Sequence, residues 1–237
     1  MRRRTDLALI LVLAAAGPAQ AQFAAPRLAP DVWRSGGAQA AVPGSSSSLD
    51  ETVLCGVYGL GDPAATTFRV LNTTSYAAFA AVPVGLAAYA AASDEPYRPA
   101  VRAALSEAAT AGVVLVAKNV VRRPRPYATL AGIEARTGGT SPDASMPSGH
   151  AALAFAAATS LALSHPRPAI VVPAYAWASG VALARVWHGV HYPSDIAVGA
   201  LVGTGVAYGV HRLLPDKAAS GRGVSASVSL GAVRLRF

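Results

Sequence analysis

Residues 147–164 read PSGHAALAFAAATSLALS, a short polar motif followed by an uncharged, alanine-rich run. Alanine and leucine favour helix, and the run is too long for a typical strand. Four further alanine-rich segments, with Glu107 as their one charged residue, are bounded by charge, by proline or by both, at residues 70–93, 103–117, 168–184 and 196–210. The sequence therefore predicts an all-α helical bundle.

Helices that are apolar all round fit either the core of a soluble bundle or a bilayer. A membrane span needs about 20 apolar residues. Segments 70–93 and 168–184 meet this length, whereas 151–164 and 196–210 are short. The last segment carries small-residue spacing that allows close helix approach, at Gly199, Gly203, Gly205 and Gly209. Because hydrophobic residues make up 53% of the chain and charged residues 14%, we favour a membrane-embedded bundle and exclude a mostly disordered protein.

The two ends of the chain differ from the helical segments in composition and sequence pattern. An arginine-rich start, an apolar run and the sequence Ala19-Gln20-Ala21 are typical of a cleaved secretory signal peptide, with an uncleaved membrane anchor as the alternative. This start predicts a bacterial cell-envelope protein. The next part is rich in Pro, Gly and Ser and predicts an irregular leader, and the C-terminal tail alternates in a strand-like way. The predicted parts are a signal peptide (1–21), a leader or linker (22–69), a helical domain (70–213) and a tail (214–237).

The formal net charge of +8 favours an anionic partner. Nucleic-acid binding usually needs a dense stripe of lysine and arginine with aromatic residues between them. Here the arginines are scattered, and Lys118 lies beside the tightest arginine cluster. The pattern therefore predicts a specific anion site and no nucleic-acid partner. The single cysteine, Cys55, excludes an intramolecular disulfide and a cysteine-based zinc cluster.

Three polar clusters lie at the ends of the apolar segments: KNVVRRPRP at 118–126, PSGH at 147–150 and RVWHGVHYPSD at 185–195. Arginine offers a planar fork of donors to a phosphate, and lysine offers a point charge. The second cluster begins a helix, where free backbone N–H groups bind anions. An up-and-down order of five helices places the loops 118–150 and 185–195 at one end. Together the clusters predict an oxyanion site.

Two histidines and one aspartate add reactive groups to this site. His191 and Asp195 lie four residues apart, so one helical turn brings them together. A carboxylate on one imidazole nitrogen fixes the tautomer and leaves the other nitrogen free to attack. His150 is then placed to protonate a leaving oxygen. This set supplies a nucleophile, an orienting group, a general acid and a charge clamp without a metal.

The motifs Lys118-x6-Arg125-Pro126, Pro147-Ser148-Gly149-His150 and Arg185-x5-His191-x3-Asp195 together resemble the signature of the type 2 phosphatidic acid phosphatase (PAP2) superfamily. That superfamily includes class A acid phosphatases, membrane lipid phosphatases and vanadium haloperoxidases. The resemblance covers residues 70–213 and implies an all-α bundle. It also implies a phosphoric ester hydrolase that forms a phosphohistidine intermediate and needs neither metal nor cofactor.

The same resemblance implies a role for each motif residue. His191 is the nucleophile, Asp195 orients it, and His150 is the general acid and later the base for water. The phosphoryl oxygens are held by Lys118, Arg125, Ser148, the Gly149 amide and Arg185. One position departs from the pattern, since Ala184 stands where the family usually has serine.

The substrate stays open among several alternatives. A membrane-embedded enzyme acts on a lipid phosphate at the periplasmic membrane face, and this is the reading we favour. A soluble periplasmic enzyme acts broadly on small phosphate esters. The same pocket can hold vanadate and oxidise halides, and a non-catalytic membrane protein can bind anionic lipid headgroups. The expected partner is thus a phosphorylated lipid or a small phosphate ester.

Overall fold

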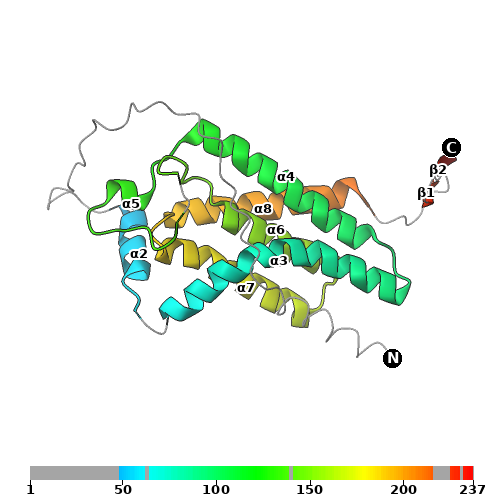
Figure 1. Ribbon diagram of the computed structural model, residues 1–237, viewed down its shortest axis with the longest axis horizontal. Helices are drawn as coiled ribbons and strands as arrows, with labels where there is room; N and C mark the ends of the chain where they lie inside the picture. The colour runs from blue at the N-terminus through cyan, green and yellow to red at the C-terminus, as the bar shows by residue number, and fades with distance from the viewer. Residues whose placement is uncertain (1–47, 62–63, 139–140, 216–224, 230–231, 237) are drawn as a thin grey trace.

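The computed structural model describes residues 48–61, 64–138, 141–215, 225–229 and 232–236. The predicted signal peptide (1–21) and most of the predicted leader lie outside the described residues. The described helices and strands follow in the order α2 (Leu49–Tyr58), α3 (Ala64–Ser93), α4 (Arg98–Val121), α5 (Pro126–Thr129), α6 (Gly149–Ser164), α7 (Pro168–Trp187), α8 (Pro193–Leu213), β1 (Ser225–Ser229) and β2 (Ala232–Arg236). Figure 1 shows the long helices running side by side as a bundle.

Each of the five alanine-rich segments lies within one long helix, which confirms the predicted all-α bundle. Proline sets several of the helix starts, since Pro168 and Pro193 are the first residues of α7 and α8 and a helix tolerates proline there. Helix α4 ends where Arg122 adopts a left-handed conformation with φ of 45°. The following Pro124 prevents the helix from continuing.

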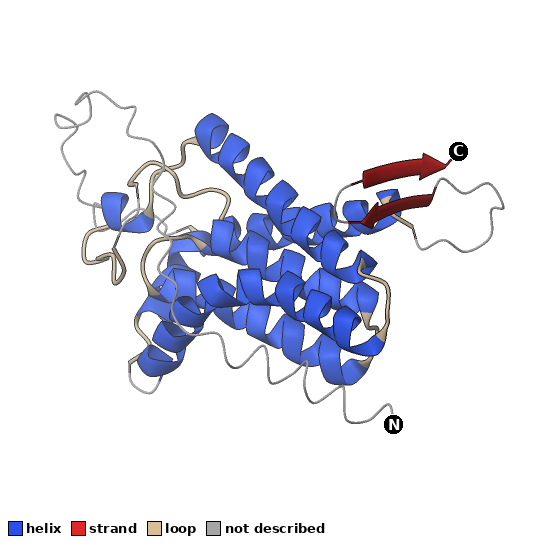
Figure 2. Ribbon diagram, turned by 45° about the vertical axis from the view of Figure 1, so that its right-hand side comes forward, coloured by secondary structure: helices blue, strands red, loops and turns tan. Residues whose placement is uncertain are grey.

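Helix α6 is the centre of the bundle and contacts α3, α4, α7 and α8. Figure 2, a view turned by 45°, shows the same long helices packed together. Six of the nine buried residues of α6 are alanine, which lets neighbouring backbones approach closely. A Cβ built on Gly199 of α8 would lie 2.6 Å from the carbonyl oxygen of Ser148. Small residues therefore bring the start of α8 against the motif that begins α6.

Four described helical stretches are long and apolar enough to cross a membrane: 64–93, 98–129, 168–187 and 193–213. Helix α6 is shorter, at 16 residues, and its alanines are buried by the helices around it. The outer faces of the surrounding helices are apolar as well. Val84 of α3 is 65% exposed, Val120 of α4 is 77% exposed and Leu201 of α8 is 73% exposed. Such outward side chains suit lipid better than water, and they favour the membrane-embedded alternative.

The range predicted as a leader or linker (22–69) contains α2 and the first residues of α3. Leu54 of α2 is fully buried and packs in a small core with Ile133 and Val186. At the other end of the chain, β1 and β2 pair as an antiparallel hairpin in which Ser227 lies opposite Arg234. The hairpin confirms the strand-like tail.

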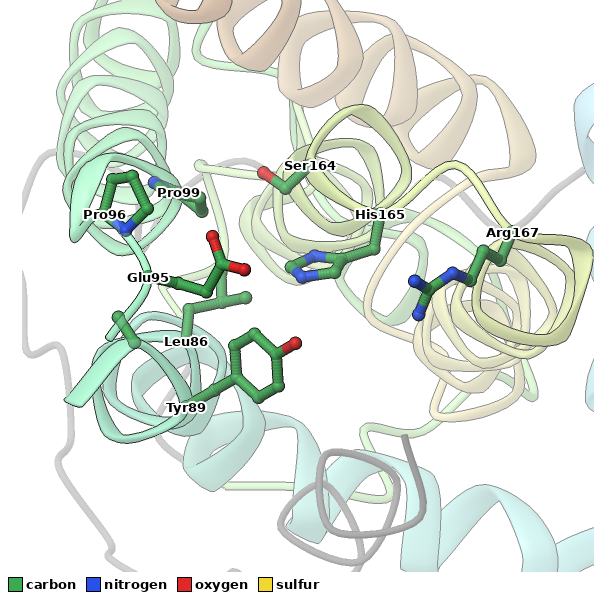
Figure 3. Close-up of a pocket in the computed structure, with 9 residues that line it drawn as sticks. Leu86, Tyr89, Glu95, Pro96, Pro99, Ser164, His165 and Arg167 are labelled. Carbon is green, nitrogen blue, oxygen red and sulfur yellow. The ribbon is translucent and has the colours of Figure 1, made fainter. Parts of the chain in front are cut away.

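A cavity of about 280 Å³ lies between the end of α3, the start of α4 and the turn from α6 into α7. Figure 3 shows Glu95, His165 and Tyr89 around it. Its lining contains none of the motif residues. The motif residues lie at the opposite end of the bundle.

Candidate active site

The three sequence motifs meet at one end of the bundle. The Arg125 guanidinium donates a 2.7 Å hydrogen bond through Nη1 to the Val190 carbonyl and lies 3.1 Å from Nε2 of His191. The Ser148 amide donates to the Asp195 carbonyl over 3.0 Å. These contacts join the loop after α4, the start of α6 and the start of α8. The predicted placement of loops 118–150 and 185–195 at one end is confirmed.

His191 is held between an arginine and a carboxylate. Its Nδ1 atom lies 3.5 Å from Oδ2 of Asp195. Because an arginine N–H can only donate, the Nε2 atom that faces Arg125 carries the lone pair and Nδ1 carries the proton. This tautomer leaves Nε2 as the nitrogen able to attack an electrophile.

The Asp195 carboxylate is completely buried and accepts three hydrogen bonds. Ser145 donates its hydroxyl over 2.5 Å, the Tyr192 amide donates over 2.8 Å, and Arg123 donates through Nη1 over 2.8 Å. A buried carboxylate with this many donors is fixed in place. It can therefore keep the imidazole of His191 in one orientation.

Burial lowers the pKa of His191 well below 6.5, and the positive charges of Arg125, Lys118 and Arg185 lower this pKa further. The Asp195 carboxylate faces the ring on its other side. A lowered pKa keeps the imidazole neutral over most of the physiological range, and only the neutral form has a lone pair. The cations that would bind a phosphate thus also keep the ring in its nucleophilic form.

Each of the three cations is positioned by a polar partner on a neighbouring segment. Lys118 donates from Nζ to the Ala144 carbonyl over 2.5 Å. Arg125 donates from Nε to the Ser141 carbonyl over 2.6 Å. Arg185, which is 3% exposed, donates from Nη1 to Oδ1 of Asn72. The Nε atom of Arg185 is buried without a hydrogen-bond partner among the described residues, so this donor is free for an anion.

His150 lies in the first turn of α6, and the aromatic rings of α3 flank it. Its ring meets Tyr76 edge-on with centroids 4.7 Å apart, and Phe79 lies at 6.0 Å. Arg185, His191, Lys118 and Arg125 are all close enough to act on its charge. Its Nε2 atom is buried and has no hydrogen-bond partner within the described part of the chain. A substrate oxygen is the kind of partner that this nitrogen lacks.

The start of α6 has the geometry expected of an anion site. Ser148 is the N-cap, and its Oγ accepts from the Ala151 amide at 3.5 Å. A Cβ built on Gly149 would meet Val114 at 3.6 Å, an ordinary contact. The protein itself therefore does not require glycine at 149, and any such requirement comes from the group that is bound there.

Two neighbours of His191 have structural roles. His188 donates from Nδ1 to the Ala184 carbonyl over 2.6 Å, and burial lowers its pKa to about 4. Gly189 has a φ of +71°, and a Cβ there would lie 2.6 Å from the Glu134 carbonyl oxygen. Only glycine fits this turn without strain, so Gly189 sets the path of the chain into His191.

Sequence reasoning missed four residues that support the motif residues: Asp50, Asn72, Arg123 and Ser145. Arg123 lies inside the first motif, two residues before Arg125. Its positive charge within that motif could have identified it as a site residue. Ser145 lies just before the second motif. Nothing in the local sequence of Asp50 or Asn72 distinguishes them, because their partners are distant in the chain.

The sequence of this chain is similar to a known family and to two curated phosphatases. The sequence model described as the PAP2 superfamily matches residues 99–219, which is 121 of the 237 residues. Decaprenylphosphoryl-5-phosphoribose phosphatase of Mycobacterium tuberculosis is 36% identical over 96 residues, 40% of this chain and 49% of that protein. The protein with the same name from Mycolicibacterium smegmatis is 40% identical over 87 residues, 36% of this chain and 43% of its own length. The matched region thus spans about half the length of the curated relatives.

Two solved structures share the fold. LpxE from Aquifex aeolicus superimposes with a TM-score of 0.60 at 22% identity, covering 70% of this chain and 97% of its own. A transmembrane PAP2-type phosphatidylglycerolphosphate phosphatase from Bacillus subtilis superimposes with a TM-score of 0.54 at 16% identity, covering 89% and 94%. These likenesses show the helical architecture.

Proposed function

The chain belongs to the PAP2 superfamily, and we propose that it hydrolyses a phosphate monoester carried by a membrane lipid, through a phosphohistidine intermediate on His191. The observation that carries the proposal is the arrangement around that ring. The Nε2 lone pair faces Arg125 at 3.1 Å while Nδ1 faces the buried Asp195 carboxylate at 3.5 Å. His150 and the cations Lys118 and Arg185 are close to the same point.

In the first step, the phosphoryl group lies among Lys118, Arg125 and Arg185, whose charges offset those of its oxygens. The Nε2 lone pair of His191 attacks phosphorus, and the bond from phosphorus to the ester oxygen breaks. Burial and the cations lower the pKa of His150, but the charges of the bound phosphoryl oxygens oppose that effect and favour the protonated ring. His150 then donates its proton to the leaving oxygen, so the lipid departs as an alcohol. The Asp195 carboxylate stabilises the positive charge that develops on the His191 ring.

In the second step, His150 is neutral and takes a proton from a water molecule. The water oxygen attacks phosphorus, the bond between phosphorus and Nε2 breaks, and inorganic phosphate is formed. Both histidines return to their starting states. Every proton and electron pair in the two steps is assigned to a residue, the substrate or water, and no other co-reactant is needed.

Two findings support a lipid as the substrate. The helices around the site are apolar on their outer faces and long enough to cross a bilayer, so the site lies at a membrane surface. The mycobacterial relatives and the Bacillus protein are named as phosphatases of phosphorylated lipids. We extend that substrate class to this chain and leave the lipid skeleton open.

We also propose that the site faces the periplasm. The end of the bundle opposite the site carries Arg98, Arg167 and Arg212, which face the cytoplasm in this orientation. Two arginines at the site end belong to the active site instead, since Arg125 lies 3.1 Å from Nε2 of His191 and Arg123 pairs with Asp195. The predicted signal peptide agrees with this orientation.

The test is phosphate release by the detergent-purified protein. Phosphatidate, phosphatidylglycerol phosphate and p-nitrophenyl phosphate are compared side by side, with the wild type, His191→Ala and His150→Gln. We expect a lipid to be preferred, His191→Ala to lose turnover by about 1,000-fold or more, and His150→Gln to lose the basic limb of the pH profile. Brief incubation with labelled substrate should leave acid-labile, alkali-stable label on the wild type and none on His191→Ala. Full turnover by His191→Ala, or preference for the soluble ester, would contradict the proposal.

A further inference from the structure

A row of alternating charges runs from α2 to the reactive histidine. It begins at Asp50, passes through Arg123 to Asp195, and ends at His191. Asp50 lies in α2, outside the family match at 99–219. The sequence motifs assign roles to Asp195 and His191 and leave Asp50 and Arg123 without one.

Four groups hold the Arg123 side chain. Its Nη1 donates to Oδ1 of Asp195 over 2.8 Å and to the Ser194 hydroxyl over 2.6 Å. Its Nη2 donates to Oδ2 of Asp50 over 2.8 Å. The guanidinium carbon also lies 4.0 Å from the centre of the Tyr192 ring. These contacts point the guanidinium at the carboxylate of Asp195, so Arg123 is not free to act as a phosphate ligand.

Asp50 binds both Arg123 and the start of α8. Its Oδ1 accepts from the Ser194 amide over 2.8 Å, and its Oδ2 accepts from the Ser194 hydroxyl. The Ser194 amide is one of the first N–H groups of α8, which have no partner within the helix. A carboxylate at that position is favourable, because a helix start carries partial positive charge. Asp50 thereby joins α2 to the helix that carries Asp195.

We infer that Asp50 and Arg123 are positioning residues for the reaction, which hold Asp195 as an oriented anion behind His191. The inference rests on the proposed function. Asp195 is completely buried, and a buried carboxylate needs a charge partner. Arg123 is that partner, and Asp50 balances the charge of Arg123 and fixes its direction. Helix α2 is thus part of the catalytic apparatus and not only a connection into the bundle.

The charges that face His191 set how tightly its imidazole holds a proton, and this property can be measured. Lys118 of α4, Arg125, and Arg185 of α7 are positive, while Asp195 of α8 is negative and His150 of α6 is a second titrating ring. Removal of Arg123 takes away the ion-pair partner of Asp195, so the negative charge of Asp195 acts more strongly on His191 and the imidazole should hold its proton more tightly. Removal of the Asp50 charge should not have that effect.

The experiment combines kinetics with a titration that does not depend on turnover. Wild type, Asp50→Asn, Arg123→Gln, Arg123→Lys and the double variant are assayed with the preferred substrate. The chain has 5 histidines, so imidazole NMR on labelled protein in micelles can follow His191, assigned with His191→Ala. Glu51→Gln is the matched control, since Glu51 lies on the same helix turn and caps it through Ser48.

We expect kcat to fall by about 100-fold in Arg123→Gln and by about 10-fold in Asp50→Asn, with KM within about threefold of the wild type. The double variant should be no slower than Arg123→Gln alone, because the two residues act as one unit. The His191 pKa should rise in Arg123→Gln, rise less in Arg123→Lys, and not rise in Asp50→Asn. Glu51→Gln should match the wild type.

Multiplicative losses in the double variant, or an unmoved His191 pKa in Arg123→Gln, would overturn the inference. Should Arg123→Gln fail to fold, Arg123→Lys and Asp50→Asn still decide it through the kcat loss at constant KM. A wild type without turnover on any substrate would instead refute the proposed function, and the NMR titration would then decide separately whether Arg123 sets the state of His191.

Discussion

Gly203 of α8 lies so close to α6 that a Cβ atom built on it would come within 1.9 Å of the Ala152 carbonyl oxygen. The clash is with backbone, which cannot rotate away. Ala152 is fully buried in the second turn of α6, directly after the motif that carries Ser148 and His150. The approach of these two helices therefore fixes the distance between the halves of the active site.

Gly203→Ala should destabilise the protein by about 1–3 kcal/mol, because the helices must separate to admit the methyl group. The melting temperature in detergent should fall by about 5 °C or more. Gly205→Ala is the matched control on the same helix, since a Cβ there meets nothing within 4 Å. It should leave the melting temperature unchanged or raise it, because alanine favours helix. Equal melting temperatures for the two variants would contradict the packing argument.

His188 should make the protein less stable in acid. Burial lowers its pKa from 6.5 to about 4, so below pH 6.5 the unfolded chain takes up a proton that the folded protein does not. The stabilising contribution is fully present above 6.5 and is lost as the pH falls through about 4. The lowered pKa of His191 acts in the same direction. Melting curves between pH 4 and 7.5 should show a smaller decline for His188→Gln than for the wild type, and identical slopes would refute this assignment.

Asn72 should matter for binding the phosphate even though it lies in an apolar helix. It accepts from the buried Arg185 guanidinium, and without this acceptor the guanidinium loses its fixed direction. Asn72→Ala should raise KM and weaken inhibition by inorganic phosphate by about 10-fold. Asn119→Ala is a suitable comparison, because its side chain donates only to the Leu115 carbonyl of its own helix. A loss of the same size in both variants would indicate a general effect on folding.

Sequence patterns predicted the parts of this structure that depend on local chemistry. The five alanine-rich segments became α3, α4, α6, α7 and α8 because alanine and leucine favour helix whatever surrounds them. The spacing of His191 and Asp195 correctly predicted a short distance, but the two residues do not share a helical turn, because His191 precedes the extended N-cap Tyr192 of α8. The helix order predicted that both polar loops lie at one end. Each of these features is set within a few residues or by topology alone.

The parts that sequence missed depend on contacts between distant residues. Asp50 and Ser194 are 144 positions apart, and Asn72 and Arg185 are 113 positions apart. No short motif records such a pairing. Asp50 follows a serine-rich stretch that predicts irregular structure, and only tertiary packing shows that it binds the start of α8. The residues that hold the motif residues in place are therefore harder to predict from sequence than the motif residues themselves.

The outer surface of the bundle distinguishes a membrane protein from a soluble one. Leu201 is 73% exposed near the middle of α8, and Leu49 is 82% exposed in α2, outside the candidate spans. In water the two leucines would be equivalent, and a charge at either position would be harmless. In a bilayer, Leu201 faces hydrocarbon while Leu49 lies in the aqueous region.

Leu201→Glu should therefore lower the amount of protein recovered in the membrane fraction and its melting temperature in detergent, because a carboxylate near the centre of a span is unfavourable by about 2–3 kcal/mol. Leu49→Glu should match the wild type in both measurements. Cells expressing each variant are lysed, washed with alkaline carbonate and extracted with detergent, and each fraction is quantified by immunoblot. The wild type should stay with the membranes until detergent is added. Release of the wild type by carbonate alone, with full stability of Leu201→Glu, would show that the bundle is soluble and would move the proposed substrate from lipids to small phosphate esters.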